Sequence, residues 1–157
     1  MEGKCPLEAK PELKPVMETI HTRFPEAGEG NIGFGSTIFA VKPGDGSARE
    51  QAASCQKVLG GWANIATEYA TKRYRSNLIN WGMLPFLIEE GPLPFTNKDY
   101  LFIPGIRKAV EEAQDTITAY TVTPEGLTPF PLTLGDLTKE ERQIILDGCL
   151  INYNRVK

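Results

Sequence analysis

The sequence predicts a single α/β domain, and three observations carry this prediction. The chain has 157 residues, enough for one domain with a proper hydrophobic core. Apolar residues make up 41% and charged residues 24%, a balance typical of globular proteins. The first half of the chain shows the patterns of strand, turn, helix, strand and helix in that order, which is the order of an α/β layer.

The first thirty residues differ in composition from the rest of the chain. They contain four prolines and many charges, and they end in a Gly-Glu-Gly sequence. We expect residues 1–30 to form an arm or linker, with one short amphipathic helix between Pro15 and Phe24. The folded domain is then expected over residues 31–157.

The first half of this domain begins with a β-rich segment. Residues 36–42 predict a buried strand, because β-branched and aromatic side chains are followed by Pro-Gly. Residues 49–59 favour a helix with Ala52, Ala53 and Val58 on its inner face, and two glycines end it. The further elements of this half are a short strand at 64–66 and a helix over 68–80, which Gly82 ends.

The second half is expected to hold further strands and one closing helix. Residues 116–122 alternate in the two-residue period of a strand. Thr138 and Glu141 have the spacing of a capping box, which predicts a helix from about Lys139 toward Asn152. Other strands are expected at 100–103 and 130–134.

The charge and hydropathy of the chain exclude several classes of partner. With 17 Lys and Arg against 20 Asp and Glu, the net charge is −3, so the chain has no overall basic field for nucleic acid. No apolar run approaches the roughly 20 residues that cross a bilayer, and the N-terminus lacks the apolar core of a signal peptide. We therefore expect a cytoplasmic protein without a membrane partner.

The cysteines and the one histidine do not suggest a metal site in this chain. Cys5, Cys55 and Cys149 are far apart, so we expect no metal or cluster held by this chain alone. A small core residue is the simpler interpretation of Cys55, and a partly exposed helix residue that of His21. Trp62 and Trp81, each beside a glycine, are expected to be packing anchors.

One segment carries the pattern of a ligand-binding turn, namely Gly-Asp-Gly-Ser-Ala-Arg-Glu between the first strand and the first helix of the domain. Ser47 and Glu50 have the S-x-x-E spacing that predicts Ser47 as the helix N-cap. Gly44 and Gly46 allow a sharp turn, and a helix start together with Arg49 suits a carboxylate or phosphate. Local physics alone favours a structural cap and tight turn over an anion site.

A longer pattern resembles a known family. GDGSAREQAA, the VLGG after it and ATKRYRSNLINWGMLPF are similar to the fourth, swivelling domain of the aconitase family over roughly Phe34 to Phe86. Members of that family show G-[DE]-G-S-S-R-E-H-A-A, then L-G-G, then a helix ending in N-L-x-x-x-G-L-L-P. The resemblance implies a swivelling β/β/α barrel-like domain in three layers, with its strands flanked by helices.

The resemblance also implies an activity, that of a hydro-lyase acting on a hydroxy-polycarboxylic acid. By position in the motif, Ser47 is the base that takes a proton next to a carboxylate. Arg49, Gly46 and Ala48 are the corresponding substrate-binding positions. The family's 4Fe-4S cluster is held by other domains as Lewis acid, so the expected partners are cluster-bearing domains and a small polycarboxylate. Alone, this chain is expected to be inactive.

The sequence departs from the family pattern in ways that keep alternatives open. Ala48 replaces the family's second serine and Gln51 its histidine, so the substrate can differ from citrate. The family's D-x-x-[ST]-T-D motif is missing, which suggests a domain truncated on its N-terminal side. The alternatives are a non-catalytic anion-binding or regulatory module and a separate small subunit of an isopropylmalate-dehydratase-like enzyme.

Overall fold

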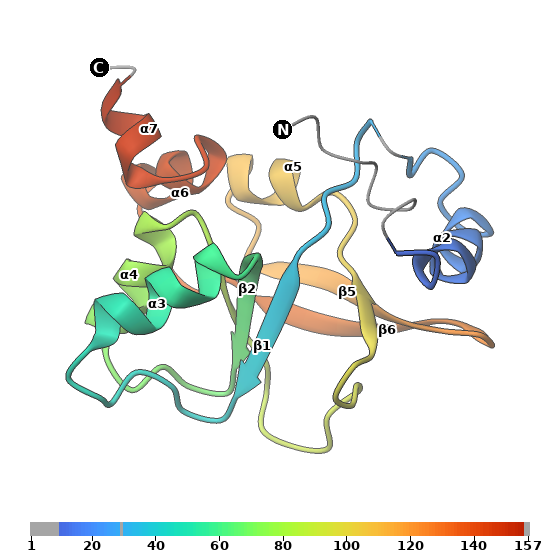
Figure 1. Ribbon diagram of the computed structural model, residues 1–157, viewed down its shortest axis with the longest axis horizontal. Coiled ribbons are helices and arrows are strands. Elements are labelled where there is room, and N and C mark those ends of the chain that lie inside the picture. The colour runs from blue at the N-terminus through green and yellow to red at the C-terminus, as the bar shows by residue number, and fades with distance from the viewer. Residues whose placement is uncertain (1–9, 29, 156–157) are drawn as a thin grey trace. The chain divides into compact units, whose positions relative to one another are not determined.

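A computed structural model describes residues 10–28 and 30–155, and it confirms the α/β class (Figure 1). Hydrogen bonds connect its strands in the order β1-β2-β3-β6-β5-β4, in a mixed sheet flanked by helices. The elements in chain order are α2 (Leu13–His21), β1 (Ser36–Ala40), α3 (Arg49–Val58), β2 (Gly61–Ala66), α4 (Lys72–Asn80), β3 (Leu84–Leu87), β4 (Tyr100–Phe102), α5 (Ile106–Glu111), β5 (Thr116–Thr123), β6 (Gly126–Thr133), α6 (Lys139–Leu146) and α7 (Leu150–Arg155).

The chain divides into two compact units, each built from several stretches of sequence. Unit 1 contains the described residues up to Phe34 together with 92–104 and 118–130. Unit 2 contains 35–91, 105–117 and the chain from Pro131 on. The longest uninterrupted stretch of either unit is therefore 35–91.

Unit 2 begins with three parallel strands joined by two helices. β1 pairs with β2, and β2 with β3, both in parallel register, with Ile38 opposite Asn64 and Ile65 opposite Phe86. α3 and α4 lie side by side and share a buried cluster (Figure 1). Because parallel strands end at the same edge of a sheet, the turns that follow β1 and β2 are neighbours. The members of the cluster are Ala53, Tyr74, Leu78 and Met83, with Tyr69 and Trp81 against it.

The prediction that the first strand is buried is wrong. β1 stands at one end of the strand order, and its residues Ser36, Thr37 and Ile38 are exposed. The inner face predicted for α3 is also only partly right, since Ala53 is buried whereas Val58 is 80% exposed. Both errors have the same cause. A strand at the edge of a sheet has a neighbouring strand on one side alone, so it is less covered, and the helix beside it has a narrower apolar surface to pack against.

The two tryptophans have different surroundings. Trp81 is partly buried against the cluster of α3 and α4, as expected of a packing anchor. Trp62 is 49% exposed and lies where the β1–β2 register shifts between Ser36 and Thr37. It nevertheless packs closely on the backbone of Gly35, where any added Cβ would overlap the indole.

The predicted closing helix is two helices. The capping box is confirmed, with the Thr138 hydroxyl accepting from the Glu141 amide and the Glu141 carboxylate accepting from the Thr138 amide. α6 then ends before Gly148, whose φ of +90° is unfavourable for other residues. Gly82 packs so closely on the Gly148 carbonyl that a Cβ there would overlap it. The helix break is therefore tied to the turn between α4 and β3.

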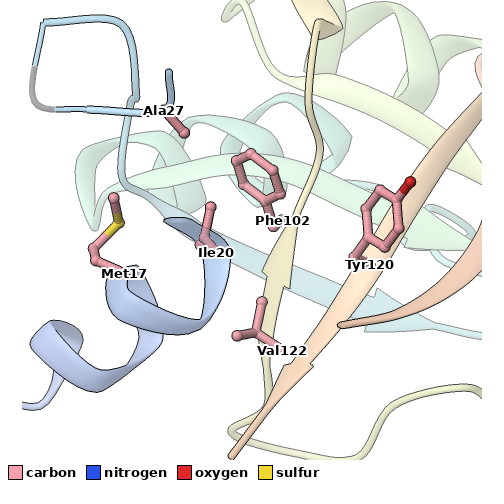
Figure 2. Packing of buried hydrophobic residues seen from close by; sticks show 6 residues of the cluster. All are labelled: Met17, Ile20, Ala27, Phe102, Tyr120 and Val122. Atoms are coloured by element: carbon pink, nitrogen blue, oxygen red, sulfur yellow. The ribbon is translucent and has the colours of Figure 1, made fainter. Parts of the chain in front are cut away.

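Unit 1 is held by a hydrophobic cluster between α2 and the strands β4 and β5, which pair antiparallel. Figure 2 shows α2 presenting Met17 and Ile20 toward Phe102. The Phe24 ring meets Phe102 edge-on with 5.2 Å between centroids. The predicted short amphipathic helix is confirmed. The division of the chain at residue 31 stays a prediction, although α2 contributes to this cluster.

The remaining predicted strands are present with shifted limits. β6 begins four residues before the predicted strand and includes Pro129 and Pro131. Prolines lack the amide that a central strand needs, and Pro131 lies within the predicted strand as well. The recorded register of β6 with β3 pairs Leu87 with Thr133, beyond both prolines. None of the described helices has the length and apolar character needed to cross a membrane.

Candidate functional site

The candidate site is the segment from Val41 to Ala48, here called the β1–α3 turn, at the carboxyl edge of the parallel strands. Its first carbonyls accept hydrogen bonds from residues 67–71, here called the β2–α4 turn. The Val41 carbonyl accepts from the Thr67 hydroxyl at 2.6 Å and from the Glu68 amide at 3.1 Å. The Pro43 carbonyl accepts from the Ala70 amide at 2.9 Å. The start of the β1–α3 turn is thus fixed to its neighbour.

Gly44 is the last fixed point of the β1–α3 turn. Its φ is +97°, and a Cβ at this position would overlap the Tyr74 side chain, so both backbone and packing require glycine. Its carbonyl accepts two hydrogen bonds, from the Thr71 hydroxyl at 3.1 Å and from Arg49 Nε at 3.2 Å. Gly44 therefore connects the site arginine to the start of α4.

A buried polar group supports the turn from below. Tyr74 is buried, and its hydroxyl accepts from Asn64 Nδ2 at 2.9 Å and from Gln56 Nε2 at 3.0 Å. Nearby, the Tyr69 hydroxyl donates to the Phe86 carbonyl at 2.9 Å. Burial raises the pKa of Tyr69, with a smaller contribution from Tyr74, so this phenol stays a neutral donor. These hydrogen bonds fix the Tyr74 ring, against which Gly44 packs.

The prediction that Ser47 caps the first helix is wrong. α3 begins at Arg49, so the N-cap position falls on Ala48, which has no side-chain acceptor. Ser47 is one residue further out and exposed, and its hydroxyl has no hydrogen-bond partner among residues 10–28 and 30–155. The start of α3 consequently keeps amide groups that no side chain caps.

Arg49 is held at one end of its guanidinium and left open at the other. Nε donates to the Gly44 carbonyl, while the two terminal nitrogens have no hydrogen-bond or ion-pair partner in the described part of the chain. The neighbouring Glu50 makes no ion pair with Arg49, and its Oε1 accepts instead from Trp81 Nε1 at 3.0 Å. A guanidinium in this state presents a positively charged fork that fits a carboxylate.

The predicted site residues line one open hollow of about 410 Å³. Gly46, Ser47, Ala48 and Arg49, which are consecutive in the sequence, all contribute to it. Nothing lies within 4 Å of a Cβ built on Gly46, which leaves its backbone open to approach. Gly44, Asp45 and Ala52 complete the lining.

Thr71 is a residue of the site that the sequence pattern did not indicate. The predicted helix began at residue 68, which placed Thr71 inside it, whereas α4 begins at Lys72 and Thr71 is its N-cap. Threonine is a preferred N-cap residue, so Thr71 is recognisable as a cap once the helix is known to begin at Lys72. Its hydroxyl bond to Gly44 joins residues 27 positions apart, which no local pattern encodes.

The described residues do not fit an iron–sulfur cluster. They contain no group of three or more His, Cys, Asp or Glu side chains close enough to hold a metal ion. Cys55 is exposed on α3, so its predicted place in the core is wrong, and Cys149 is partly buried near the helix break. The cluster that the resemblance implies is therefore not assigned to these residues.

Comparison with known proteins finds a family match over the β1–α3 turn and the strands around it. Residues 35–91 match the family model of the aconitase C-terminal domain. No curated protein gives a significant match to the chain. The matched residues are the longest uninterrupted stretch of unit 2 and contain β1 to β3, both helices between them and the whole β1–α3 turn. This segment, residues 35–91, therefore belongs to the aconitase C-terminal domain family.

Proposed function

We propose that this chain supplies part of the active site of an aconitase-like hydro-lyase, which removes water from a hydroxy-polycarboxylic acid and adds it back. The observation that carries the proposal is the open β1–α3 turn within the family segment, where Ser47 and Arg49 line one hollow. Membership of the family gives the turn a chemical role, and the geometry supports that role.

Arg49 is the proposed carboxylate-binding residue. Its terminal nitrogens are free of partners in the described chain, and the uncapped start of α3 adds amide donors and partial positive charge. Both features stabilise a negatively charged group that binds in the hollow. Gly46 and Ala48 contribute backbone there, and the small Ala48 side chain leaves room that the family's second serine fills.

Ser47 is the proposed base, which takes the proton from the carbon next to the bound carboxylate. A serine hydroxyl has a pKa far above neutral, so it acts as a base only where positive charge and donors stabilise its ionised form. Arg49 and the amides at the start of α3 are the groups of this chain suited to that task. The hydroxide leaves from the adjacent carbon, and partner domains assist that departure.

The proposed partners are cluster-bearing domains, in the same protein or in a partner subunit, and a small polycarboxylate substrate. Because the described residues do not fit a cluster, no role in holding it is assigned to them. A small subunit of an isopropylmalate-dehydratase-like enzyme is one form that such an arrangement takes. In either form the isolated chain is expected to lack turnover.

The test is reconstitution of the chain with its cluster-bearing domains, followed by an assay of dehydration through absorbance of the unsaturated product. We expect Ser47→Ala to lower kcat by about 10²- to 10⁴-fold, the usual contribution of a general base, with KM little changed. Ser54→Ala on α3 is the matched control, since its hydroxyl bonds only within its own helix, to the Gln51 carbonyl. Unchanged turnover in Ser47→Ala refutes the proposed base.

A second candidate, a non-catalytic anion-binding module, is favoured by one observation. The Ser47 hydroxyl is exposed and has no partner among the described residues that would activate it. On this alternative Arg49→Ala abolishes citrate binding by the isolated chain, Ser47→Ala leaves that binding unchanged, and the chain gives no turnover when it is combined with cluster-bearing domains. The two candidates therefore differ in whether the reconstituted protein turns over its substrate.

A further inference from the structure

We propose that Thr71 is a positioning residue for Arg49: its hydroxyl holds the Gly44 carbonyl, and this carbonyl holds Nε of the guanidinium. The inference rests on the proposed function, in which Arg49 binds a carboxylate. It adds a residue outside the glycine–serine–arginine motif, from the turn after the neighbouring strand.

The Thr71 hydroxyl makes two hydrogen bonds, one within its own helix start and one to the β1–α3 turn. It accepts from the Tyr74 amide at 3.2 Å, which caps α4, and it donates to the Gly44 carbonyl at 3.1 Å. The same carbonyl accepts from Arg49 Nε at 3.2 Å. One oxygen of the β1–α3 turn thus receives both the threonine and the arginine.

The position of this carbonyl is not fixed by other means within the turn. Bonds from the β2–α4 turn fix the carbonyls of Val41 and Pro43, but Gly44 is the last residue so anchored. Glycine at a φ of +97° has no side chain that resists rotation of the following peptide. The packing of Tyr74 limits inward movement of Gly44, whereas Thr71 sets the direction of its carbonyl.

Holding Nε of Arg49 affects how its two terminal nitrogens bind a ligand. A guanidinium fixed at Nε loses little further freedom when its two terminal nitrogens bind a carboxylate, so fixing it in advance strengthens binding. Without the Thr71 bond, the Gly44 carbonyl is free to turn and Nε loses its acceptor. Thr71 therefore acts on ligand affinity without lining the hollow itself.

The experiment measures hydrogen exchange of the Arg49 Nε–H by NMR in the full, ligand-free chain, with the signal assigned from Arg49→Lys. Thr71→Val removes the hydroxyl and Thr71→Ser keeps it. We expect exchange about fivefold faster in Thr71→Val, the factor for one hydrogen bond, and wild-type exchange in Thr71→Ser.

Thr138→Val is the matched control for lost stability. It removes a threonine cap of the same kind from α6, without a bond to the β1–α3 turn. We expect it to lower the free energy of unfolding as Thr71→Val does, yet to leave exchange at Arg49 unchanged. Wild-type exchange in Thr71→Val, or equally faster exchange in Thr138→Val, overturns the inference.

Citrate titration separates this inference from the function on which it rests. We expect Thr71→Val to weaken citrate binding about fivefold and Arg49→Ala to abolish it. Measurable citrate binding that is equal in the wild type and Arg49→Ala overturns the carboxylate-binding role of Arg49 in the proposed function. The exchange result decides separately whether Thr71 holds the arginine.

Discussion

The starts of α3 and α4 are neighbours in unit 2, yet they satisfy their first amides in opposite ways. At α4, Thr71 has extended backbone with φ −143° and ψ 144°, and its hydroxyl accepts from the Tyr74 amide. At α3, Ala48 has φ −88° and ψ 52°, and no side chain caps the helix. The two helix starts follow adjacent parallel strands and differ in whether a side chain of the protein accepts a hydrogen bond from their first amides.

This difference indicates which of the two turns is available for a ligand. A capped start has its donors satisfied and serves stability, whereas an uncapped start leaves them for solvent or for an anion. The capped turn also fixes the open one, through its bonds to the carbonyls of Val41, Pro43 and Gly44. One turn therefore provides the rigidity on which the other depends.

The largest expected effect is that of Gly44→Ala, which breaks the contact between the two turns. The new Cβ would overlap Tyr74 and would force alanine into a φ of +97°, so we expect a loss of about 3–4 kcal/mol in the free energy of unfolding. Urea unfolding followed by circular dichroism measures it. Gly46→Ala is the control, with a change within about 0.5 kcal/mol because its Cβ meets nothing. Equal losses in both variants would contradict the assigned role of Gly44.

An intermediate effect is expected from Thr71→Ala, which removes the cap from α4. Loss of a threonine N-cap costs about 1–2 kcal/mol of stability. Thr71→Ser should stay within about 0.5 kcal/mol of the wild type in the same urea titration, because serine caps as well. A Thr71→Ala variant as stable as the wild type would show that the two helix starts do not differ as described.

The smallest effect is expected from Ala48→Ser, which places a hydroxyl at the uncapped start. Because the backbone there is not extended as it is at Thr71, the new hydroxyl is poorly placed to cap α3. We expect the free energy of unfolding to change by less than about 0.5 kcal/mol. A gain near 1 kcal/mol in thermal or urea unfolding would mean that only the missing side chain distinguishes the two starts.

The sequence was most informative where the fold is local. In 35–91, the alternation of strand and helix, the glycines that end α3 and the motif of the β1–α3 turn are encoded within a few residues. These local patterns indicate the turn, and the resemblance to the aconitase family indicates the site residues on it. Their roles as base and carboxylate-binding group stay predictions.

What the sequence did not indicate depends on contacts between distant residues. The exposure of β1 and Val58 follows from the place of β1 at the sheet edge, which its own composition does not encode. The break at Gly148 accompanies close packing on Gly82. The packing of α2 on β4 and β5 in unit 1 likewise joins segments far apart in the chain.

The edge position of β1 has a practical consequence for every experiment above. Among the described strands β1 has only β2 beside it, and its sequence Ser-Thr-Ile-Phe-Ala contains no charge or proline. Natural proteins commonly protect such edges with those residues, because an unprotected edge recruits strands of other molecules. We expect concentrated samples to aggregate first through this strand, so a lysine in place of the exposed Thr37 is a sensible background for solution work.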